Sequence, residues 1–317
     1  MHSTITTRTL VGLGAMLAGL AASPASGYKL VDKYDDANFF HEFDFFNAPD
    51  PTHGFIQYQS ANSANADKLA GFAQSGVYLG LDHTTANPAG GRASVRVSSR
   101  KTYTHGLFIA DIAHAPSSTC GVWPAFWLTD EAAWPNHGEI DVIEGVNAAM
   151  SNIITLHTGP GCTVTNGASG NLKDGNCNAG GGNMGCSQDT KAPYGDAFND
   201  VGGGVYAMEW TADAISVWHF PRTAIPADAL SASPNPATWG APTAKFVGGA
   251  GCDIDSHFKN HKIIFNIATC GDWAGQVWAS DPECSALAKT CNDYVGANPA
   301  AFTNAYWLIN SVGVFQQ

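Results

Sequence analysis

The sequence is poor in charge, and in positive charge above all. Only 13% of its 317 residues are charged, and its 15 lysines and arginines are outnumbered by 27 aspartates and glutamates, for a formal net charge of −12. Nucleic acids and anionic lipids bind proteins through basic surfaces, so this balance argues against both as partners. A neutral polymer remains compatible with it. Helical periodicity sustained over three turns is also absent after residue 26, which argues against a helical bundle.

The chain has no hydrophobic stretch long enough to span a membrane. The longest uncharged apolar segment runs from Leu10 to Ala22, 13 residues, and a spanning helix needs about 20. Arg8 precedes this segment and small residues follow it up to Gly27, which is the pattern of a signal peptide. We therefore expect residues 1–26 to be a signal peptide, residues 27–317 to form the folded domain, and the protein to be secreted without a membrane anchor. A buried N-terminal helix is the alternative.

The eight cysteines include no Cys-x2-Cys pair, so a zinc site is disfavoured. An even number of cysteines in an exported chain instead predicts up to four disulfides, with 105 possible pairings left open. The glycine-rich stretch 159–185, with Cys162, Cys177 and the adjoining Cys186, is expected to be a loop fixed by disulfides. The stretch 221–242 holds five prolines and is expected to be a surface loop rather than a linker.

Short segments of alternating apolar and polar residues recur along the chain and predict an all-β fold, a sandwich or a barrel. A hairpin is expected in which 206–210 turns at 211–213 into 215–220. The other expected strands are 77–79, 94–98, 107–112, 153–157, 262–267 and 306–309.

Three acids interrupt a strand-like segment, Gly138-Glu139-Ile140-Asp141-Val142-Ile143-Glu144-Gly145. On a regular strand, Glu139 and Asp141 share a face and Glu144 points the other way. A β-bulge at Val142-Ile143 would bring all three onto one face. The outer carboxyls would then lie about 5 Å apart, as in retaining glycosidases. The segment therefore predicts two carboxylates that attack a glycosidic bond. The alternative is a solvated strand face.

Tryptophans surround this segment in the sequence. Trp123, Trp127 and Trp134 precede it and Trp273 follows it, and indole planes can stack on the CH faces of sugar rings. Each could equally fill the core. Core packing is the better interpretation for Trp210, Trp218 and Trp307, which lie within strand-like segments.

The sequence resembles glycoside hydrolase family 16, in particular the secreted fungal laminarinase-type endo-1,3(4)-β-glucanases. The resemblance begins in Trp123-Pro124-Ala125-Phe126-Trp127 and the acidic segment through Asn147. It continues in 156–158, 162–164, 206–211 and Cys270-Gly271-Asp272-Trp273-Ala274-Gly275. It implies a concanavalin A-like β-jelly-roll sandwich, with an open cleft for a linear glucan on its concave sheet, and hydrolysis with retention of anomeric configuration.

Position by position, the resemblance implies that Glu139 is the nucleophile, Glu144 the general acid/base and Asp141 the assisting carboxylate. The mechanism needs an ionised nucleophile and a protonated acid/base, so the pKa values of the two glutamates must differ. Asp141 can raise the pKa of Glu144 by like-charge repulsion and hydrogen-bond to Glu139. His157 is expected on a neighbouring strand, in contact with the acids and lining the cleft, although a structural role is equally open. We expect no metal and no cofactor, and a monomeric protein.

Two other functions remain open. A lectin on the same sandwich would bind glucan without cleaving it, but would have no need for the clustered acids. A transglycosylase acting on cell-wall glucan would use the same covalent intermediate. Members of the family that act on chitin–glucan linkages generally carry the shorter Glu-x-Asp-x-Glu form, so the longer form here favours hydrolysis. The preference between β-1,3 and mixed β-1,3/1,4 linkages is left open.

Overall fold

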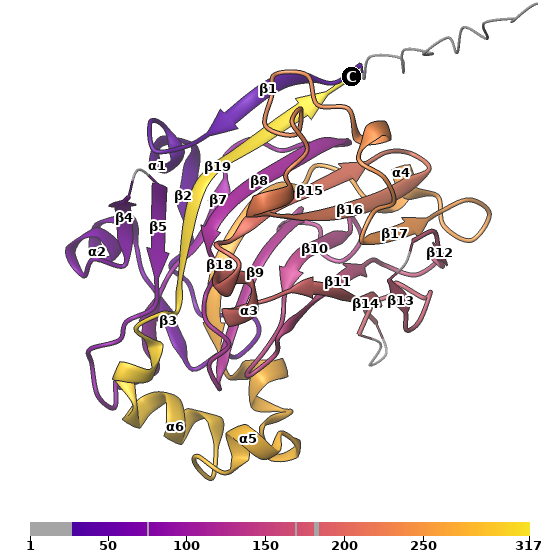
Figure 1. Ribbon diagram of the computed structural model, residues 1–317. Helices are drawn as coiled ribbons and strands as arrows, with labels where there is room; N and C mark the ends of the chain where they lie inside the picture. Colours follow the sequence, from indigo (N-terminus) through magenta and orange to yellow (C-terminus); the bar gives the residue numbers. More distant parts are fainter. Residues whose placement is uncertain (1–26, 75, 169, 181–183) are drawn as a thin grey trace, which may run out of the picture.

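Two antiparallel β-sheets face each other and hold most of the strand residues in the computed structural model (Figure 1). The structure describes residues 27–74, 76–168, 170–180 and 184–317. The expected signal peptide, residues 1–26, lies outside these residues. The all-β sandwich expected from the alternating segments is confirmed.

The first sheet has nine strands in the order β12-β17-β16-β15-β8-β19-β5-β4, with β1 added alongside β19. Its strands are β1 (Lys29–Tyr34), β4 (Ala70–Ala73), β5 (Gly76–Gly80), β8 (Gly106–His114), β12 (Thr165–Asn166), β15 (Gly204–Trp210), β16 (Ala214–Pro221), β17 (Ala244–Val247) and β19 (Tyr306–Gln316). The expected hairpin is present as β15 and β16. Strand β19 runs seven residues past the predicted end, because register shifts between Leu308 and Ser311 break its alternation.

The second sheet has eight strands in the order β13-β14-β11-β10-β9-β18-β7-β2, and its central strands carry the acidic segment. Its strands are β2 (Phe43–Phe45), β7 (Arg96–Ser99), β9 (Val122–Thr129), β10 (Glu139–Glu144), β11 (Ser151–His157), β13 (Asn171–Leu172), β14 (Cys186–Pro193) and β18 (Lys262–Thr269). A short parallel pair, β3 (Ile56–Tyr58) and β6 (Arg92–Ser94), completes the strands.

The core lies between the two sheets and follows from the alternation of side chains. On β18, Ile263, Phe265 and Ile267 are fully buried in it, so the intervening residues face the outer side of the second sheet. Phe265 packs edge to face against Trp307 of the first sheet, with ring centroids 5.6 Å apart. Trp210 and Trp307 are completely buried in this core, as expected. Trp218 is also buried, at 5% exposure, but in a smaller apolar cluster outside it.

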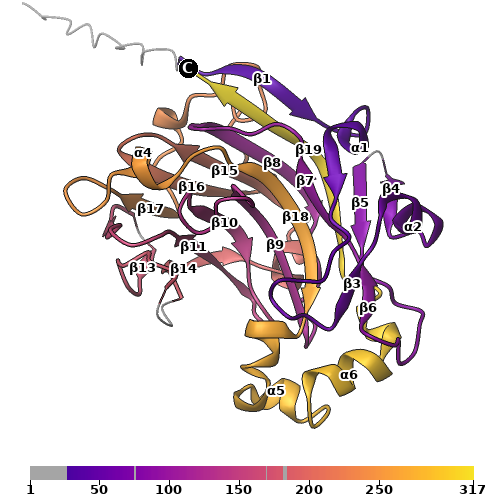
Figure 2. The same ribbon diagram turned by 180° about the vertical axis from the view of Figure 1, so that it is seen from behind.

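Helices are short and lie around the sheets. They are α1 (Phe39–Glu42), α2 (Ala61–Ala66), α3 (Asp196–Asp200), α4 (Ile254–His257), α5 (Pro282–Ser285) and α6 (Cys291–Ala297), with single turns at Arg222–Ala224, Pro236–Thr238, Gly271–Gly275, Trp278–Ser280 and Pro299–Phe302. Helices α5 and α6 form a cap at one end of the sandwich (Figure 2). In the described part of the chain, no helix has the length and apolar character needed to cross a membrane.

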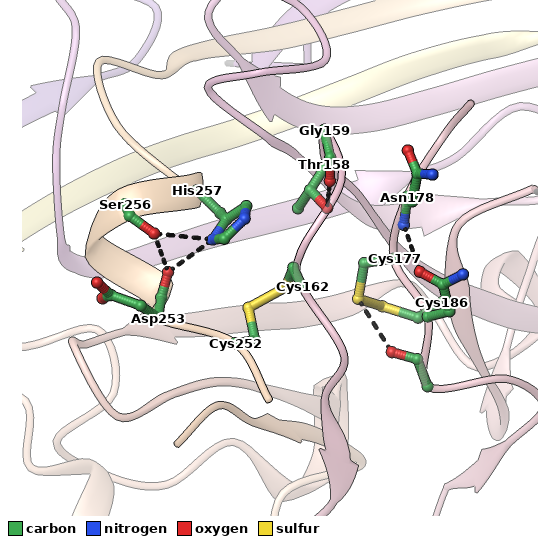
Figure 3. Close-up of a disulfide and its surroundings, with 12 residues drawn as sticks. Thr158, Gly159, Cys162, Cys177, Asn178, Cys186, Cys252, Asp253, Ser256 and His257 are labelled. Carbon is green, nitrogen blue, oxygen red and sulfur yellow. Dashed lines mark hydrogen bonds between the residues drawn. A yellow bond between two sulfur atoms is a disulfide. The ribbon is translucent and has the colours of Figure 1, made fainter. Parts of the chain in front are cut away.

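All eight cysteines form disulfides, as expected for four bridges. The pairs Cys120–Cys284 and Cys270–Cys291 tie the helical cap to the ends of β9 and β18. Cys162–Cys252 and Cys177–Cys186 fix the glycine-rich loop (Figure 3). The loop prediction for 159–185 is therefore confirmed, with the two-residue strands β12 and β13 inside it.

The proline-rich stretch 221–242 is a surface loop and not a linker. It connects β16 to β17, which pair with each other in the first sheet. Trp239 from this loop packs edge to face against Trp218, with ring centroids 5.7 Å apart, and covers apolar side chains on the outer face of that sheet.

Candidate active site

A β-bulge in β10 brings the three acids to the same pocket. Against β11, Asp141 pairs with Thr155 and Glu144 with Ile153, so Val142 and Ile143 together lie opposite a single residue. The pairing of β10 with β9 shifts at the same place. The bulge is where the sequence predicted it, and it turns Glu144 to the face that carries Glu139 and Asp141.

The pocket at this face has a volume of about 490 Å³ and lies over the central strands of the second sheet. Its lining residues come from β7, β9, β10, β18 and the loops beside them: Asp50, Pro51, Thr52, Arg96, Trp123, Ala125, Trp127, Thr129, Glu131, Trp134, Glu139, Asp141, Glu144, Asn266, Ala268 and Asp272. All three acids line it together. The expectation of an open cleft beyond this pocket stays a prediction.

Asp141 is buried and the two glutamates are partly buried, and burial is the main cause of the altered pKa values of all three acids. It raises the pKa of both Glu139 and Glu144 to about 8, helped in each case by the nearby Asp141. Asp141 is 2% exposed, and burial raises its pKa well above the usual range. The expected repulsion by Asp141 at Glu144 is therefore present. Because both glutamates are raised alike, the three carboxyls share protons as one coupled set.

Specific neighbours act differently on the two glutamates. The indole Nε1 of Trp123 donates a hydrogen bond of 2.8 Å to Glu144 Oε1, which lowers the pKa of Glu144. The guanidinium of Arg96 lowers the pKa of Glu139. Both effects are smaller than the effect of burial. His157 lowers the pKa of both glutamates, whereas Trp123 acts on Glu144 and Arg96 on Glu139.

His157 lies on β11 directly opposite Glu139, as expected for a neighbouring strand. Its Nε2 is 3.3 Å from Asp141 Oδ2 and 3.7 Å from Glu139 Oε1. The expected contact with the acids is therefore present. Its side chain does not belong to the described pocket lining, so a direct contact with substrate stays a prediction.

Three of the four candidate tryptophan platforms line the pocket. Trp123 and Trp127 come from β9, and Trp134, which is 49% exposed, lies in the loop between β9 and β10. Trp273 is not part of this lining and instead packs edge to face against Trp123, with ring centroids 5.8 Å apart. Its neighbour Asp272 reaches the pocket.

The sequence interpretation missed several polar residues of the pocket. Arg96 is held between Phe46 and Trp127, 4.8 Å from each ring centroid, and its Nη2 donates to Glu131 at 2.7 Å. Asn266 accepts a hydrogen bond of 2.9 Å from Trp127 Nε1. Arg96 on β7 and Asn266 on β18 alternate with core residues. This alternation could have predicted that their side chains lie on the same face as the acids. Asp50 and Thr52 come from a distant loop, for which no signal existed.

This chain is similar to known proteins of one family. A family model described as XgeA-like, catalytic GH16 domain, matches residues 43–315. An endo-1,3(4)-β-glucanase of Arthroderma benhamiae is 45% identical over 311 residues, which is 95% of this chain and 68% of that protein. A probable endo-1,3(4)-β-glucanase of Aspergillus fumigatus is 43% identical over 309 residues, 94% of this chain. The chain spans only 47% of the length of that relative.

Solved structures of the same family have the same fold. Laminarinase 16A from Phanerochaete chrysosporium, solved with 6-O-glucosyl-laminaritriose in both donor and acceptor sites, superimposes with a TM-score of 0.85 at 44% identity, covering 91% of this chain and 99% of that one. A family 16 elongating β-1,3-glucosyltransferase superimposes with a TM-score of 0.84 at 40% identity, covering 91% of this chain and 100% of that one. The jelly-roll sandwich expected from the resemblance is therefore confirmed.

Proposed function

Because the chain belongs to glycoside hydrolase family 16, we propose that it is an endo-acting β-glucanase that hydrolyses β-1,3 and mixed β-1,3/1,4 glucan with retention of configuration. One observation carries this proposal. The bulge at Val142-Ile143 brings Glu139, Asp141 and Glu144 into the same pocket, where two carboxyls could act on either side of one glycosidic bond.

In the proposed mechanism, Glu139 attacks the anomeric carbon and Glu144 protonates the leaving oxygen. Glu144 then removes a proton from the water that hydrolyses the glycosyl-enzyme. The pKa of both glutamates is raised to about 8, so Glu144 is protonated at neutral pH, as a general acid requires, and Glu139 needs a positive charge beside it to ionise. The ionised form of Glu139 is favoured by Arg96 and, when protonated, by His157.

Asp141 would assist by exchanging a proton with its neighbours. A protonated Asp141 can donate a hydrogen bond to an ionised neighbour and so stabilise the nucleophile's charge without adding a second one. Its separation from water, at 2% exposure, favours the neutral form. The separation of about 5 Å between the outer carboxyls stays part of the proposal.

The aromatic lining supports a sugar polymer as substrate. Trp123, Trp127 and Trp134 present indole groups in the pocket, and the exposed ring of Trp134 is available for stacking. We propose Trp123, Trp127, Trp134 and Trp273 as substrate-binding residues, with His157 supporting the acids. Trp273 would act by holding Trp123, against which it packs.

We further propose that the protein is exported and acts extracellularly. Four disulfides tie loops and cap to the sheets, and such bonds persist in oxidising compartments. The signal-peptide pattern of residues 1–26 supports the same location from sequence alone. A monomer acting on a β-glucan, without nucleic acid or membrane as partner, fits the acidic composition.

A glucosyltransferase is the second candidate. The observation that favours it is the similarity to the elongating β-1,3-glucosyltransferase, at 40% identity. Such an enzyme would form the same glycosyl-enzyme but pass the sugar to a second glucan chain in place of water.

The test is a product profile on laminarin, lichenan and cellulose, with Glu139→Ala as control. We expect reducing ends from laminarin and lichenan, products that first appear as the β-anomer by NMR, and no activity in the variant. First-formed α-anomers would contradict the retaining mechanism. Products longer than a laminari-oligosaccharide substrate would favour the glucosyltransferase, and binding to laminarin without cleavage would favour a lectin.

A further inference from the structure

The acids and His157 create a second chemical possibility besides glycosidic cleavage. One carboxylate oxygen each from Glu139 and Asp141 and one ring nitrogen of His157 lie within 4.8 Å of one another. These are two oxygen ligands and one imidazole ligand, a set that suits Zn²⁺ or Cu²⁺ better than Mg²⁺ or Ca²⁺. The three side chains come from two paired strands, so their positions are fixed by the sheet.

The spacing of these atoms matches a metal site without a large movement. Zinc binds nitrogen and oxygen ligands at about 2.0–2.2 Å, so neighbouring ligands of a tetrahedral site lie about 3.3–3.6 Å apart. His157 Nε2 is 3.3 Å from Asp141 Oδ2 and 3.7 Å from Glu139 Oε1. Two edges of the tetrahedron are therefore close to their required length.

A second observation points to a ligand at this place. Asp141 Oδ2 is buried and has no hydrogen-bond partner, although His157 Nε2 lies nearby. A buried carboxylate oxygen that accepts no hydrogen bond is costly. A cation between Asp141 and His157 would satisfy it, and the acids that bind the cation would release their protons.

We propose that Glu139, Asp141 and His157 bind a divalent transition-metal ion, with Zn²⁺ as the reference ion, and that this ion blocks the pocket. The fourth coordination position would point toward the pocket and hold water. Binding requires only these three donors, whereas inhibition rests on the proposed function, because the ion would occupy the electron pair with which Glu139 attacks the sugar.

The other cluster of potential ligands in the described residues does not offer such a site. Cys162, Cys252 and His257 lie close together, but the two sulfurs are joined to each other (Figure 3). The ring of His257 is also engaged by the carbonyl oxygens of Asp253 and Pro160. A disulfide offers no thiolate to a metal.

The test is calorimetric titration of Zn²⁺ into the full chain at pH 7 with three matched variants. Glu144→Gln should abolish glucan cleavage but keep all three donors, so its affinity should stay within a few-fold of wild type. His157→Gln should weaken binding by about 100-fold, since it removes the nitrogen ligand. His105→Gln alters a different His–Asp pair, 2.7 Å from Asp255, and should bind as wild type does.

If His157→Gln fails to fold, as judged by circular dichroism, Asp141→Asn replaces it with the same expectation. One ion per chain, lost in His157→Gln, supports the proposal. Absence of stoichiometric binding, or unchanged affinity in His157→Gln, overturns it. A Co²⁺-loaded chain should also show the intense visible bands of tetrahedral coordination, and bands of an octahedral ion would overturn the assigned geometry.

Activity separates this proposal from the proposed function. Zn²⁺ should inhibit laminarin hydrolysis, and a chelator should restore it. If the metal-free chain cleaves no glucan but Zn²⁺ still binds through His157, the metal-site proposal stands and the glucanase proposal is overturned. Cleavage that saturating Zn²⁺ leaves unchanged would overturn the blocking role.

Discussion

The side-chain amide of Asn152 hydrogen-bonds to both sides of the bulge that positions Glu144. Its Oδ1 accepts from the backbone N–H of Glu144 at 2.9 Å, and its Nδ2 donates to the carbonyl of Val142 at 2.8 Å. Asn152 is completely buried on the neighbouring strand. A bulge interrupts the regular ladder, and this amide supplies the two hydrogen bonds that the ladder loses there.

Asn152→Ala should therefore disturb the catalytic strand as well as the fold. Two buried backbone groups would lose their partners, at a cost of about 2–4 kcal/mol in the free energy of unfolding. Displacement of Glu144 should also lower kcat by about 100-fold. Denaturant unfolding and laminarin kinetics measure the two effects.

Asn152→Asp is the matched control. Its carboxylate can still accept from Glu144 N–H but cannot donate to Val142, so it should fall between alanine and wild type in kcat. An alanine variant that loses stability but keeps its kcat would mean that the bulge holds its shape without the amide.

The sandwich could be predicted from sequence wherever alternation was intact. The hairpin of β15 and β16 has its turn at the expected residues, because apolar side chains repeat on one face of each strand. Strand β1 escaped prediction because its first three residues are exposed. The helices α5 and α6 have four and seven residues, too few for an extended amphipathic pattern, and disulfides to Cys120 and Cys270 hold them in place.

Some residues of the candidate site could likewise be predicted from the sequence, and others could not. The three acids lie within six consecutive residues, Glu139 to Glu144. Their position on one face could therefore be predicted by assuming a single bulge. Asp272 and the loop around Thr52 could not be predicted to meet, because Asp272 N–H donates to Thr52 O at 2.9 Å across more than two hundred residues. Contacts between loops depend on the tertiary structure, and the alternation of apolar and polar residues predicts only single strands.

Azide should distinguish the roles of the two glutamates. In Glu144→Ala the glycosyl-enzyme still forms from an activated aryl glucoside, and azide then attacks it to give a β-glycosyl azide. In Glu139→Ala azide replaces the missing nucleophile and gives an α-glycosyl azide. NMR of the products identifies each anomer. The reverse pattern would exchange the assigned roles.

The raised pKa values of the two active-site glutamates should make stability fall as pH rises. In the unfolded chain these carboxyls ionise near pH 4.5, whereas burial raises the pKa of Glu144 to about 8 in the folded protein. Between these values the folded state binds more protons than the unfolded state, so stability decreases from about pH 4.5 to 8. Glu144→Gln removes this ionisation. Its Tm advantage over wild type should therefore grow from pH 5 to pH 8.

Thermal unfolding at several pH values measures this difference. Glu283→Gln, which changes an exposed glutamate on α5, serves as the control and should show no growing advantage. A constant offset between Glu144→Gln and wild type would mean that Glu144 ionises at the same pH in both states.

Trp123→Phe should shift the alkaline limb of the pH–activity profile upward. The indole N–H of Trp123 donates to Glu144 and lowers the pKa of that carboxyl, so its removal should raise the pKa of Glu144 further. A general acid with a higher pKa remains protonated to higher pH, and activity should persist correspondingly further. Trp127→Phe is the control, since that indole donates to Asn266 instead. If both variants shift the limb equally, the loss of an aromatic sugar platform, and not the hydrogen bond to Glu144, is the cause.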